Sequence, residues 1–307
     1  MVLILDGKTH AENMLNEVRI RVEKRLTQGL RPPCLAVVIV GDDPASKVYV
    51  RGKISACSRT GIRSIERRIS AEISQSELED AITSLNYDPE IDGILVQLPL
   101  PKGLDIKRAI RNIDPRKDVD GLHPLNQGLL MTGQPGLRPC TPSACMSMLK
   151  AYGITMKGKR AVILGRSEIV GKPISMMLLE EHATVTIAHS MTKELPKLCL
   201  EADILVAAVG RPGLVEGSWV KPGATVVDVG INRVENLTLG EQIFQYETNK
   251  LDAIKHNGGV LCGDVRFGEV SAKAGAITPV PGGVGPITIA GLMVNALQAC
   301  QNIENIK

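Results

Sequence analysis

Aromatic residues are scarce in this chain, which has two Phe, four Tyr and one Trp among 307 residues. A protein that binds single-stranded nucleic acid by base stacking needs several exposed rings, so the scarcity argues against that class. Net charge is also small, because 36 basic residues meet 33 acidic ones, and no basic or acidic tail is evident. With 44% hydrophobic residues the chain is too apolar to be disordered. The core must be built from aliphatic side chains, which suits buried parallel strands covered by helices.

Long hydrophobic runs and clustered metal ligands are missing as well. No run of about 18 apolar residues occurs, so no transmembrane helix is expected. Residues 2–5 are apolar but Asp6 follows at once, which predicts a first strand rather than a signal peptide. Seven scattered cysteines without a CxxC pair, and five scattered histidines, favour reduced thiols in the cytoplasm and no metal site.

Strand and helix patterns alternate along the whole chain, which predicts an α/β fold. We expect two three-layer α/β domains with a cleft between them, the second a Rossmann-like doubly wound parallel sheet. The first would comprise residues 1–142, completed by a C-terminal helix at 287–307, and the second residues 143–286. The segments expected to be strands are 2–5, 35–40, 94–98, 160–164, 184–188, 204–209, 225–229 and a short one near 260–261.

The second domain opens with a strand and a glycine-containing turn that resembles a dinucleotide site. Gly165 ends the strand, Ser167 stands where the usual motif has a second glycine, and Gly171 follows after a longer gap. A helix beginning here would direct free N–H groups at a pyrophosphate. Because the match to G-x-G-x-x-G is imperfect, an ordinary strand–turn–helix connection stays open.

The cofactor expected from this turn is NADP. An NAD site commonly has Asp or Glu at the end of the next strand, whereas residues 188–191 contain none. Arg166 lies in the phosphate turn, and Ser190 can donate a hydrogen bond, which suits a 2′-phosphate. The alternative is that Arg166 is a solvated surface residue.

The first domain places three polar residues on one face of an expected helix. Ser46, Tyr49 and Lys53 are spaced i, i+3 and i+7, and the helix follows a buried strand. The tyrosine ring can lie against a flat ligand, and burial can lower the pKa of the lysine enough to make it a base. Spacing alone favours the alternative of a solvated lysine and a half-buried tyrosine.

Further polar groups follow the next buried strand. Gln97 ends that strand, where its amide faces the expected ligand crevice or caps a loop. Asp118 and Asp120 lie in a charged turn, where they either point to one side or cap the turn. The Gly/Pro-rich loops 139–142 and 278–286 flank the second domain and are either hinges or pocket walls.

Taken together, these segments resemble one family, the bifunctional methylenetetrahydrofolate dehydrogenase/methenyltetrahydrofolate cyclohydrolases. The resemblance spans nearly the whole chain, and seven motifs in the right order make it specific. They are residues 49–53 (YVRGK), 93–101 (GILVQLPLP), 117–121 (KDVDG), 139–142 (PCTP), 165–173 (GRSEIVGKP), 228–232 (DVGIN) and 279–286 (PVPGGVGP).

The resemblance implies oxidation of 5,10-methylenetetrahydrofolate with NADP, then hydrolysis of the methenyl product to 10-formyltetrahydrofolate, in one-carbon metabolism. Lys53 would be the catalytic lysine, Gln97 its hydrogen-bonding neighbour, and Tyr49 would pack on the folate. Asp120 would hold the pterin ring. The loop containing Gly282 and Gly283 would close the folate side.

The resemblance also implies the dinucleotide contacts and the assembly. The cofactor would be bound by Gly165, Arg166, Ser167, Ser190 and Ile231. Family members form homodimers chiefly through their cofactor domains, and neither nucleic acid nor a membrane is an expected partner.

One departure from the family pattern lies at Met191, where members often have a basic residue. Its loss removes one phosphate contact, although no acidic residue takes its place, so NADP stays favoured over NAD. The alternatives are a dehydrogenase of the same family without cyclohydrolase activity, a Rossmann dehydrogenase for another substrate, and a non-catalytic dinucleotide sensor. Lys53, Gln97 and Tyr49 together argue against a monofunctional enzyme.

Overall fold

The computed structural model describes residues 2–42 and 44–305, with the backbone but not the side chains of residues 44–49 and 305. Tyr49 and Ser46 therefore have side chains outside the described part of the chain. The chain divides into two compact units. Residues 11–140 and the segment from Thr288 onward form one, here called the three-stranded unit; the segment up to His10 and residues 141–287 form the other, the six-stranded unit.

The three-stranded unit contains a parallel sheet in the order β3-β2-β4. Its central strand is buried along its whole length, as expected for an aliphatic run with helices on both faces. The strands are β2 (Cys34–Val40), β3 (Arg63–Ile69) and β4 (Gly93–Val96). The helices are α1 (Gly7–Thr27), which begins in the other unit, α2 (Pro44–Thr60), α3 (Gln75–Tyr87), α4 (Ile106–Arg111), α5 (Pro124–Met131) and α12 (Val284–Asn305), which also begins there.

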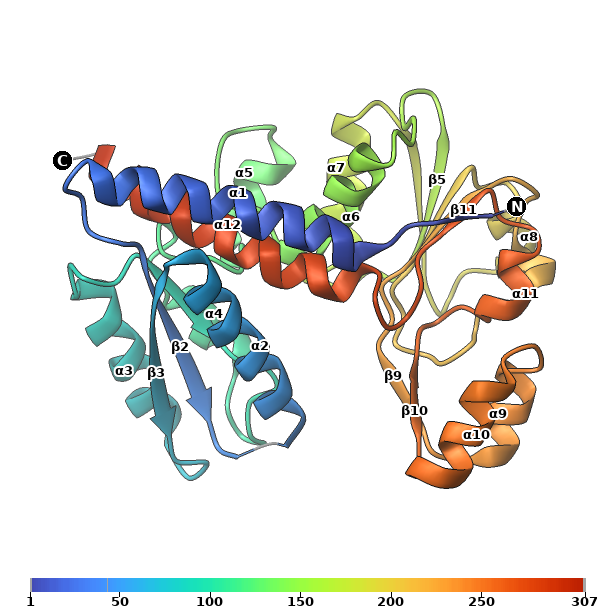
Figure 1. The fold of residues 1–307 in the computed structure, drawn as a ribbon, viewed down its shortest axis with the longest axis horizontal. Helices are drawn as coiled ribbons and strands as arrows, with labels where there is room; N and C mark the ends of the chain where they lie inside the picture. The colour runs from blue at the N-terminus through green and yellow to red at the C-terminus, as the bar shows by residue number, and fades with distance from the viewer. Residues whose placement is uncertain (1, 43, 306–307) are drawn as a thin grey trace. The chain divides into compact units, whose positions relative to one another are not determined.

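Helices pack on this sheet through two distinct sets of contacts. Leu78 and Ile82 of α3 join alternate residues of β2 in one apolar cluster. The helices α1 and α12 run side by side (Figure 1) and are joined by an ion pair between Arg25 and Glu304. The Sγ of Cys57 on α2 lies 3.5 Å from the Sδ of Met293, which brings α12 against α2 as well. The C-terminal helix is thus part of this unit.

The strand β3 is not among those expected from the sequence. It is an edge strand whose residues are mostly exposed, and charged side chains occupy most of it. Burial alternation is therefore missing, and its parallel pairing with β2 is what makes it a strand.

The six-stranded unit contains a parallel sheet in the order β1-β11-β8-β7-β5-β6. This order, with helical crossovers, confirms the predicted α/β class and the doubly wound character of the second domain. Its strands are β1 (Leu3–Ile4), β5 (Arg160–Leu164), β6 (Thr184–Ala188), β7 (Ile204–Ala207), β8 (Thr225–Asp228) and β11 (Ala276–Ile277). Its helices are α6 (Cys140–Ala151), α7 (Gly171–Glu180), α8 (Leu195–Cys199), α11 (Phe267–Ser271) and the 3-10 helix η1 (Gly217–Trp219).

The N-terminal strand β1 belongs to this second sheet. Leu3 pairs with Ala276 and Ile4 with Ile277. The sequence grouped residues 1–10 with the first domain, whereas contacts place the segment up to His10 in the six-stranded unit. A two-residue pairing between distant segments leaves no local signal in the sequence.

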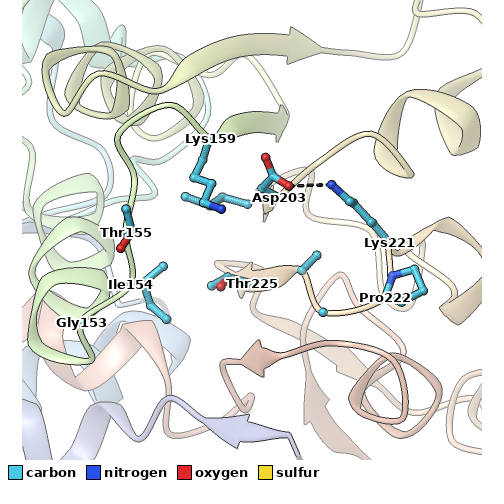
Figure 2. Close-up of a pocket in the computed structure, with 11 residues that line it drawn as sticks. Gly153, Ile154, Thr155, Lys159, Asp203, Lys221, Pro222 and Thr225 are labelled. Atoms are coloured by element: carbon cyan, nitrogen blue, oxygen red, sulfur yellow. Dashed lines mark hydrogen bonds and ion pairs between the residues drawn. The ribbon is translucent and has the colours of Figure 1, made fainter.

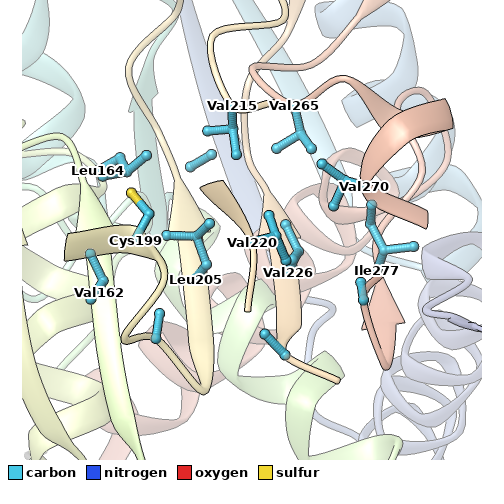
Figure 3. Packing of buried hydrophobic residues seen from close by; sticks show 14 of the residues in the cluster. Val162, Leu164, Cys199, Leu205, Val215, Val220, Val226, Val265, Val270 and Ile277 are labelled. Carbon is cyan, nitrogen blue, oxygen red and sulfur yellow. The ribbon is translucent and has the colours of Figure 1, made fainter. Parts of the chain in front are cut away.

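The core of the six-stranded unit is almost entirely aliphatic, as the shortage of aromatics requires. Figure 3 shows Leu205 of β7 and Val226 of β8 in one cluster with Ile277 of β11. Val215 and Val270 complete the packing from segments outside these strands.

A small antiparallel pair lies outside the main sheet. It joins β9 (Asn232–Val234) to β10 (Val260–Cys262), and α9 (Leu237–Ile243) and α10 (Thr248–Asn257) lie between them in the chain. The strand expected near residues 260–261 is therefore present, but it pairs with β9 instead of extending the doubly wound sheet. Among the described residues, no helix is both long and apolar enough to cross a membrane.

Candidate active site

Two of the residues singled out in the first domain, Lys53 and Gln97, meet at the carboxyl end of β4. Lys53, on α2, donates through Nζ to the Oε1 of Gln97 at 2.9 Å. Gln97 follows β4, is buried, and donates its own Nε2 to the carbonyl of Leu98 at 2.6 Å. The amide therefore bonds the loop backbone and the lysine together, which agrees with loop capping, and its orientation toward a ligand stays a prediction.

Lys53 is held in surroundings that disfavour its charge. Burial lowers the pKa of Lys53, while the carboxylate of Asp120 acts to raise it. Burial likewise raises the pKa of Asp120, against the opposing effects of Lys53 and of a hydrogen bond with Cys140. Both groups are thus driven toward their neutral forms, which suits a lysine that accepts a proton.

The two aspartates of the charged turn have separate roles. Asp118 accepts hydrogen bonds from the backbone N–H of His123 at 2.7 Å and from the Nδ2 of Asn126 at 2.8 Å. It therefore caps the turn, and only Asp120 lies within electrostatic reach of Lys53. Asp118 thus caps the turn, as one of the two alternatives from the sequence had it. For Asp120, an orientation toward a ligand stays a prediction.

Two residues without an assigned role complete this site. Cys140 is buried, its Sγ donates to the carbonyl of Val119 at 3.3 Å, and burial raises the pKa of its thiol well above the usual value. Asn295, on α12, donates through Nδ2 to the carbonyls of Val119 and Arg138, both at 2.8 Å. These carbonyls directly precede Asp120 and the Pro139–Cys140 pair, so one amide from the last helix fixes the backbone on both sides of the site. Spacing cannot reveal Asn295, because its partners are backbone atoms distant in the chain.

The glycine turn after β5 has the close backbone approach expected of it. Gly165 has φ +116°, and a Cβ there would lie 2.2 Å from the carbonyl oxygen of Ala208. A Cβ on Gly171 would lie 2.2 Å from the carbonyl oxygen of Gly165. Ser167, where the usual motif has glycine, accepts through Oγ from the N–H of Val170 at 3.1 Å and of Gly171 at 3.3 Å. The serine therefore caps the start of α7.

The side chains expected around the dinucleotide are exposed at the carboxyl edge of the six-stranded sheet. Arg166 and Ser190 are both exposed. Ile231 follows β8 and has 48% of its surface exposed. Met191 is 77% exposed, and the segment after β6 carries no carboxylate in its place.

The glycines of the loop before α12 are engaged within the six-stranded unit. The carbonyl of Gly282 accepts from the N–H of Gly7 at 2.9 Å. A Cβ on Gly7 would lie 1.7 Å from the carbonyl oxygen of Gly283, so the loop packs directly on the start of α1. Both glycines are buried.

A separate cavity of about 250 Å³ lies at the opposite, amino edge of the six-stranded sheet (Figure 2). Lys159 and Thr225 line it, and Asp203 forms an ion pair with Lys221 at 2.6 Å there. Parallel α/β sheets bind ligands at their carboxyl ends, so this cavity lies at the wrong edge for the dinucleotide.

Two family models cover most of the chain. The catalytic domain of the tetrahydrofolate dehydrogenase/cyclohydrolases matches residues 5–120, and the NAD(P)-binding domain of the same family matches residues 139–304. The chain belongs to this family. The resemblance read from the seven motifs is thereby confirmed.

Curated relatives and solved structures agree along the full length. A bifunctional protein FolD of Bordetella avium is 50% identical over 298 residues, covering 97% of this chain and 97% of the relative. One from Koribacter versatilis is 48% identical over 301 residues, covering 98% and 97%.

Two crystal structures illustrate the likeness in fold. The bifunctional FolD enzyme of Campylobacter jejuni superposes with a TM-score of 0.89 at 42% identity, covering 98% of this chain and 99% of that one. The dehydrogenase-cyclohydrolase of Trypanosoma brucei, solved with NADP and an inhibitor, gives 0.88 at 36% identity, covering 98% of each chain.

Proposed function

We propose that this chain oxidises 5,10-methylenetetrahydrofolate to the 5,10-methenyl form with NADP and then hydrolyses that product to 10-formyltetrahydrofolate. The observation that carries the proposal is the hydrogen bond between Lys53 and Gln97 beside Asp120, in a member of the tetrahydrofolate dehydrogenase/cyclohydrolase family. The curated relatives are named bifunctional proteins, and this chain matches them over nearly their full length, which supports both activities in one chain.

Lys53 would act in the hydrolytic step as a base. The methenyl intermediate is a cation, so a permanently charged lysine close to it would oppose its formation. Burial favours the neutral amine, which can take a proton from water as the water oxygen bonds to the methenyl carbon. Gln97 keeps the amine in place without adding charge. The following cleavage of the carbon–nitrogen bond leaves the formyl group on N10 and a proton on N5.

Asp120 would orient the folate by accepting hydrogen bonds from the donor groups of the pterin. Tyr49 would pack on the folate one helical turn before Lys53, and the Gly282–Gly283 loop would close the folate side. Rigid positioning of the methylene carbon is the main task of these residues, because the cofactor supplies the redox chemistry.

The residues at the carboxyl edge of the six-stranded sheet fit a dinucleotide. Gly165 allows a close approach to the backbone of Ala208 that a Cβ would prevent, and Arg166 is exposed beside it. We assign Gly165, Arg166, Ser167 and Ile231 to the dinucleotide, with Ser190 toward its 2′-phosphate. When bound, NADP accepts the hydride from the substrate. The absence of an acidic residue at 188–191, where β6 ends, favours NADP over NAD.

A homodimer in the cytoplasm is the assembly that we infer. In the six-stranded sheet β6 is an edge strand, with Ile187 and the neighbouring Leu179 of α7 exposed by 37% and 54%. An exposed, partly apolar edge of this kind suits pairing with a second copy. All seven cysteines are buried and unpaired, which suits a reducing compartment.

The direct test is a spectrophotometric assay with 5,10-methylenetetrahydrofolate, run separately with NADP and with NAD. We expect reduction of NADP, transient formation of the methenyl product and its loss by hydrolysis, with slower reduction of NAD. If neither NADP nor NAD is reduced, the proposal is refuted. If the methenyl product accumulates in a 1:1 ratio to the reduced dinucleotide, the protein is a monofunctional dehydrogenase.

A further inference from the structure

Two buried carboxylates lie beneath the carboxyl edge of the six-stranded sheet and have no part in the chemistry above. Asp228 ends β8 and Asp264 follows β10, with 3% and 0% of their surfaces exposed. Within the described part of the chain, the hydrogen bonds to both carboxylates come from backbone N–H groups and one amide side chain. A buried charge held in this way is costly unless the donors are fixed precisely, so it calls for an explanation.

Asp264 accepts hydrogen bonds from the loop after β7 and from Asn232, the first residue of β9. Its Oδ2 accepts from the N–H groups of Val209 at 2.7 Å and Gly210 at 3.0 Å. Its Oδ1 accepts from the N–H of Arg211 at 2.8 Å and from the Nδ2 of Asn232 at 2.9 Å. Three consecutive backbone donors curl around one carboxylate, so the shape of residues 209–211 depends on this side chain.

Both segments lie next to residues assigned to the dinucleotide. Residues 208–211 follow β7, and Ala208 donates its N–H to the carbonyl of Leu164 at 2.8 Å, beside Gly165. The carbonyl oxygen of Ala208 is also the atom that forbids a Cβ on Gly165. Asn232 directly follows Ile231, a residue assigned above to the dinucleotide. Asp264 therefore ties the loop after β7 to the loop after β8 at the edge where parallel sheets bind their ligands.

Asp228 fixes the backbone of the segment that carries Asp264. Its carboxylate accepts from the N–H groups of Asp264 and Val265, both at 2.9 Å, and from that of Gly230 at 3.0 Å. The fit is close, because a Cβ on Gly263 would lie 1.8 Å from the Oδ2 of Asp228. The backbone that carries Asp264 is thus itself fixed.

We propose that Asp264 is a positioning residue of the dinucleotide site, which shapes the loops after β7 and β8 into the surface that receives the cofactor. The inference rests on the proposed function. It predicts that loss of Asp264 weakens dinucleotide binding and spares the hydrolysis of methenyltetrahydrofolate, which consumes no dinucleotide and depends on Lys53 and Gln97 of the three-stranded unit.

The test is the substitution Asp264→Asn. The amide keeps the shape but turns an NH₂ group toward backbone donors, so at least one loop N–H loses its acceptor. We expect the Kd for NADP, measured by titration calorimetry with NADP alone, and the KM for NADP to rise by about tenfold or more. The kcat at saturating NADP and the cyclohydrolase rate without dinucleotide should stay within about twofold of the parent.

The matched control is Asp203→Asn. Asp203 also accepts from a backbone N–H, that of Arg160 at 2.9 Å, but at the amino edge of the same sheet. It should leave NADP binding unchanged. An unaltered Kd and KM in a folded Asp264→Asn variant would overturn the inference, as would a parallel loss of both activities, which marks a general structural role.

A second variant covers the case in which Asp264→Asn does not fold. Asn232→Ala removes one donor to the carboxylate and leaves the backbone donors in place. We expect a smaller rise in the Kd for NADP, about threefold, and an unchanged value would overturn the inference. Failure of the proposed function is distinguishable, because the parent protein itself would then not reduce NADP in the presence of the folate substrate.

Discussion

At the scale of single residues, the site depends on Lys53, on whose protonation two opposing effects act. Burial favours the neutral amine, and the carboxylate of Asp120 favours the ammonium ion, so the pKa of Lys53 reflects the balance of the two. Cys140 adds no charge of its own at neutral pH, because burial and Asp120 raise the pKa of its thiol well above the usual value. Asp120 is therefore the group through which the proton affinity of Lys53 can be changed.

The substitution Asp120→Asn should move the pH dependence of hydrolysis. A base works when it is neutral, so the cyclohydrolase rate rises with pH through the pKa of Lys53. Removing the carboxylate removes an effect that raises this pKa, and the rising limb should shift to lower pH. The measurement is kcat/KM for methenyltetrahydrofolate against pH, corrected for uncatalysed hydrolysis.

Asp114→Asn is the control for this profile. Asp114 lies in the same charged turn but forms an ion pair with Arg116 at the surface, and it is not among the groups that perturb the pKa of Lys53. Its profile should match the parent. A limb that stays in place or moves to higher pH in Asp120→Asn would contradict the electrostatic role of Asp120.

Residue patterns in the sequence predicted some residues of this site but not others, and the difference has a physical reason. Lys53 lies within α2, Gln97 and Asp120 lie in loops, and each belongs to a short motif; the contact expected between Lys53 and Gln97 is observed as a hydrogen bond. Asn295 and Asp264 bind backbone atoms far away in the chain. Such contacts impose no spacing on the sequence.

At the scale of elements, the strands with aliphatic runs were predictable, whereas β3 and β11 were not. The strand at 35–40 is present as β2 because its aliphatic run signals burial on both faces. The charged strand β3 and the two-residue strand β11 carry no such signal and form through pairing with neighbours, whereas β1 lies within the apolar run expected at residues 2–5. The capping box of Ser74 and Glu77, by contrast, is local, and it is observed at the start of α3.

Helix α12 should contribute to folate binding through Asn295. Asn295→Ala removes the amide donor shared by the carbonyls of Val119 and Arg138, which should cost about 1–3 kcal/mol in the free energy of unfolding. Because these carbonyls flank Asp120 and Cys140, we also expect the KM for the folate substrate to rise by about threefold or more. Denaturant unfolding and steady-state kinetics measure the two effects.

The comparison variant on the same helix is Gln301→Ala. Gln301 bonds the exposed Arg21 at 2.9 Å, far from Asp120 in the chain, and its loss should change stability by less than about 0.5 kcal/mol. Equal effects of the two substitutions on the folate KM would contradict a specific role for Asn295.

At the scale of the whole molecule, two units are built from a chain that passes between them more than once. Residues up to His10 join the six-stranded unit, and the segment from Thr288 onward returns to the three-stranded unit. The C-terminal return was an expectation from the sequence, whereas the N-terminal exchange was not. Each end of the chain thus belongs to a unit formed mainly by residues distant from it in the sequence. A single cut in the chain therefore cannot separate the two units into complete halves.

The inferred homodimer can be tested at the edge of the six-stranded sheet. Ile187→Lys places a charge on the exposed edge strand β6, which should prevent pairing with a second copy and shift the protein from dimer to monomer. Sedimentation velocity reports the change. Ile65→Lys is the control, since Ile65 is similarly exposed, at 38%, on the edge strand β3 of the other sheet. A monomeric parent, or a dimer that survives Ile187→Lys, would contradict this interface.

The central claim is that one chain performs both reactions and that Lys53 is required for the second. The decisive measurement follows the methenyl product and NADPH together after methylenetetrahydrofolate and NADP are mixed with the Lys53→Met variant. Lys150→Met, on an exposed lysine of α6, serves as the control, and thermal unfolding verifies that both variants are folded. We predict that Lys53→Met hydrolyses methenyltetrahydrofolate no faster than buffer does, so that any methenyl product formed accumulates in step with NADPH, while the control hydrolyses it as the parent does. Hydrolysis by folded Lys53→Met at the parent rate would contradict the account.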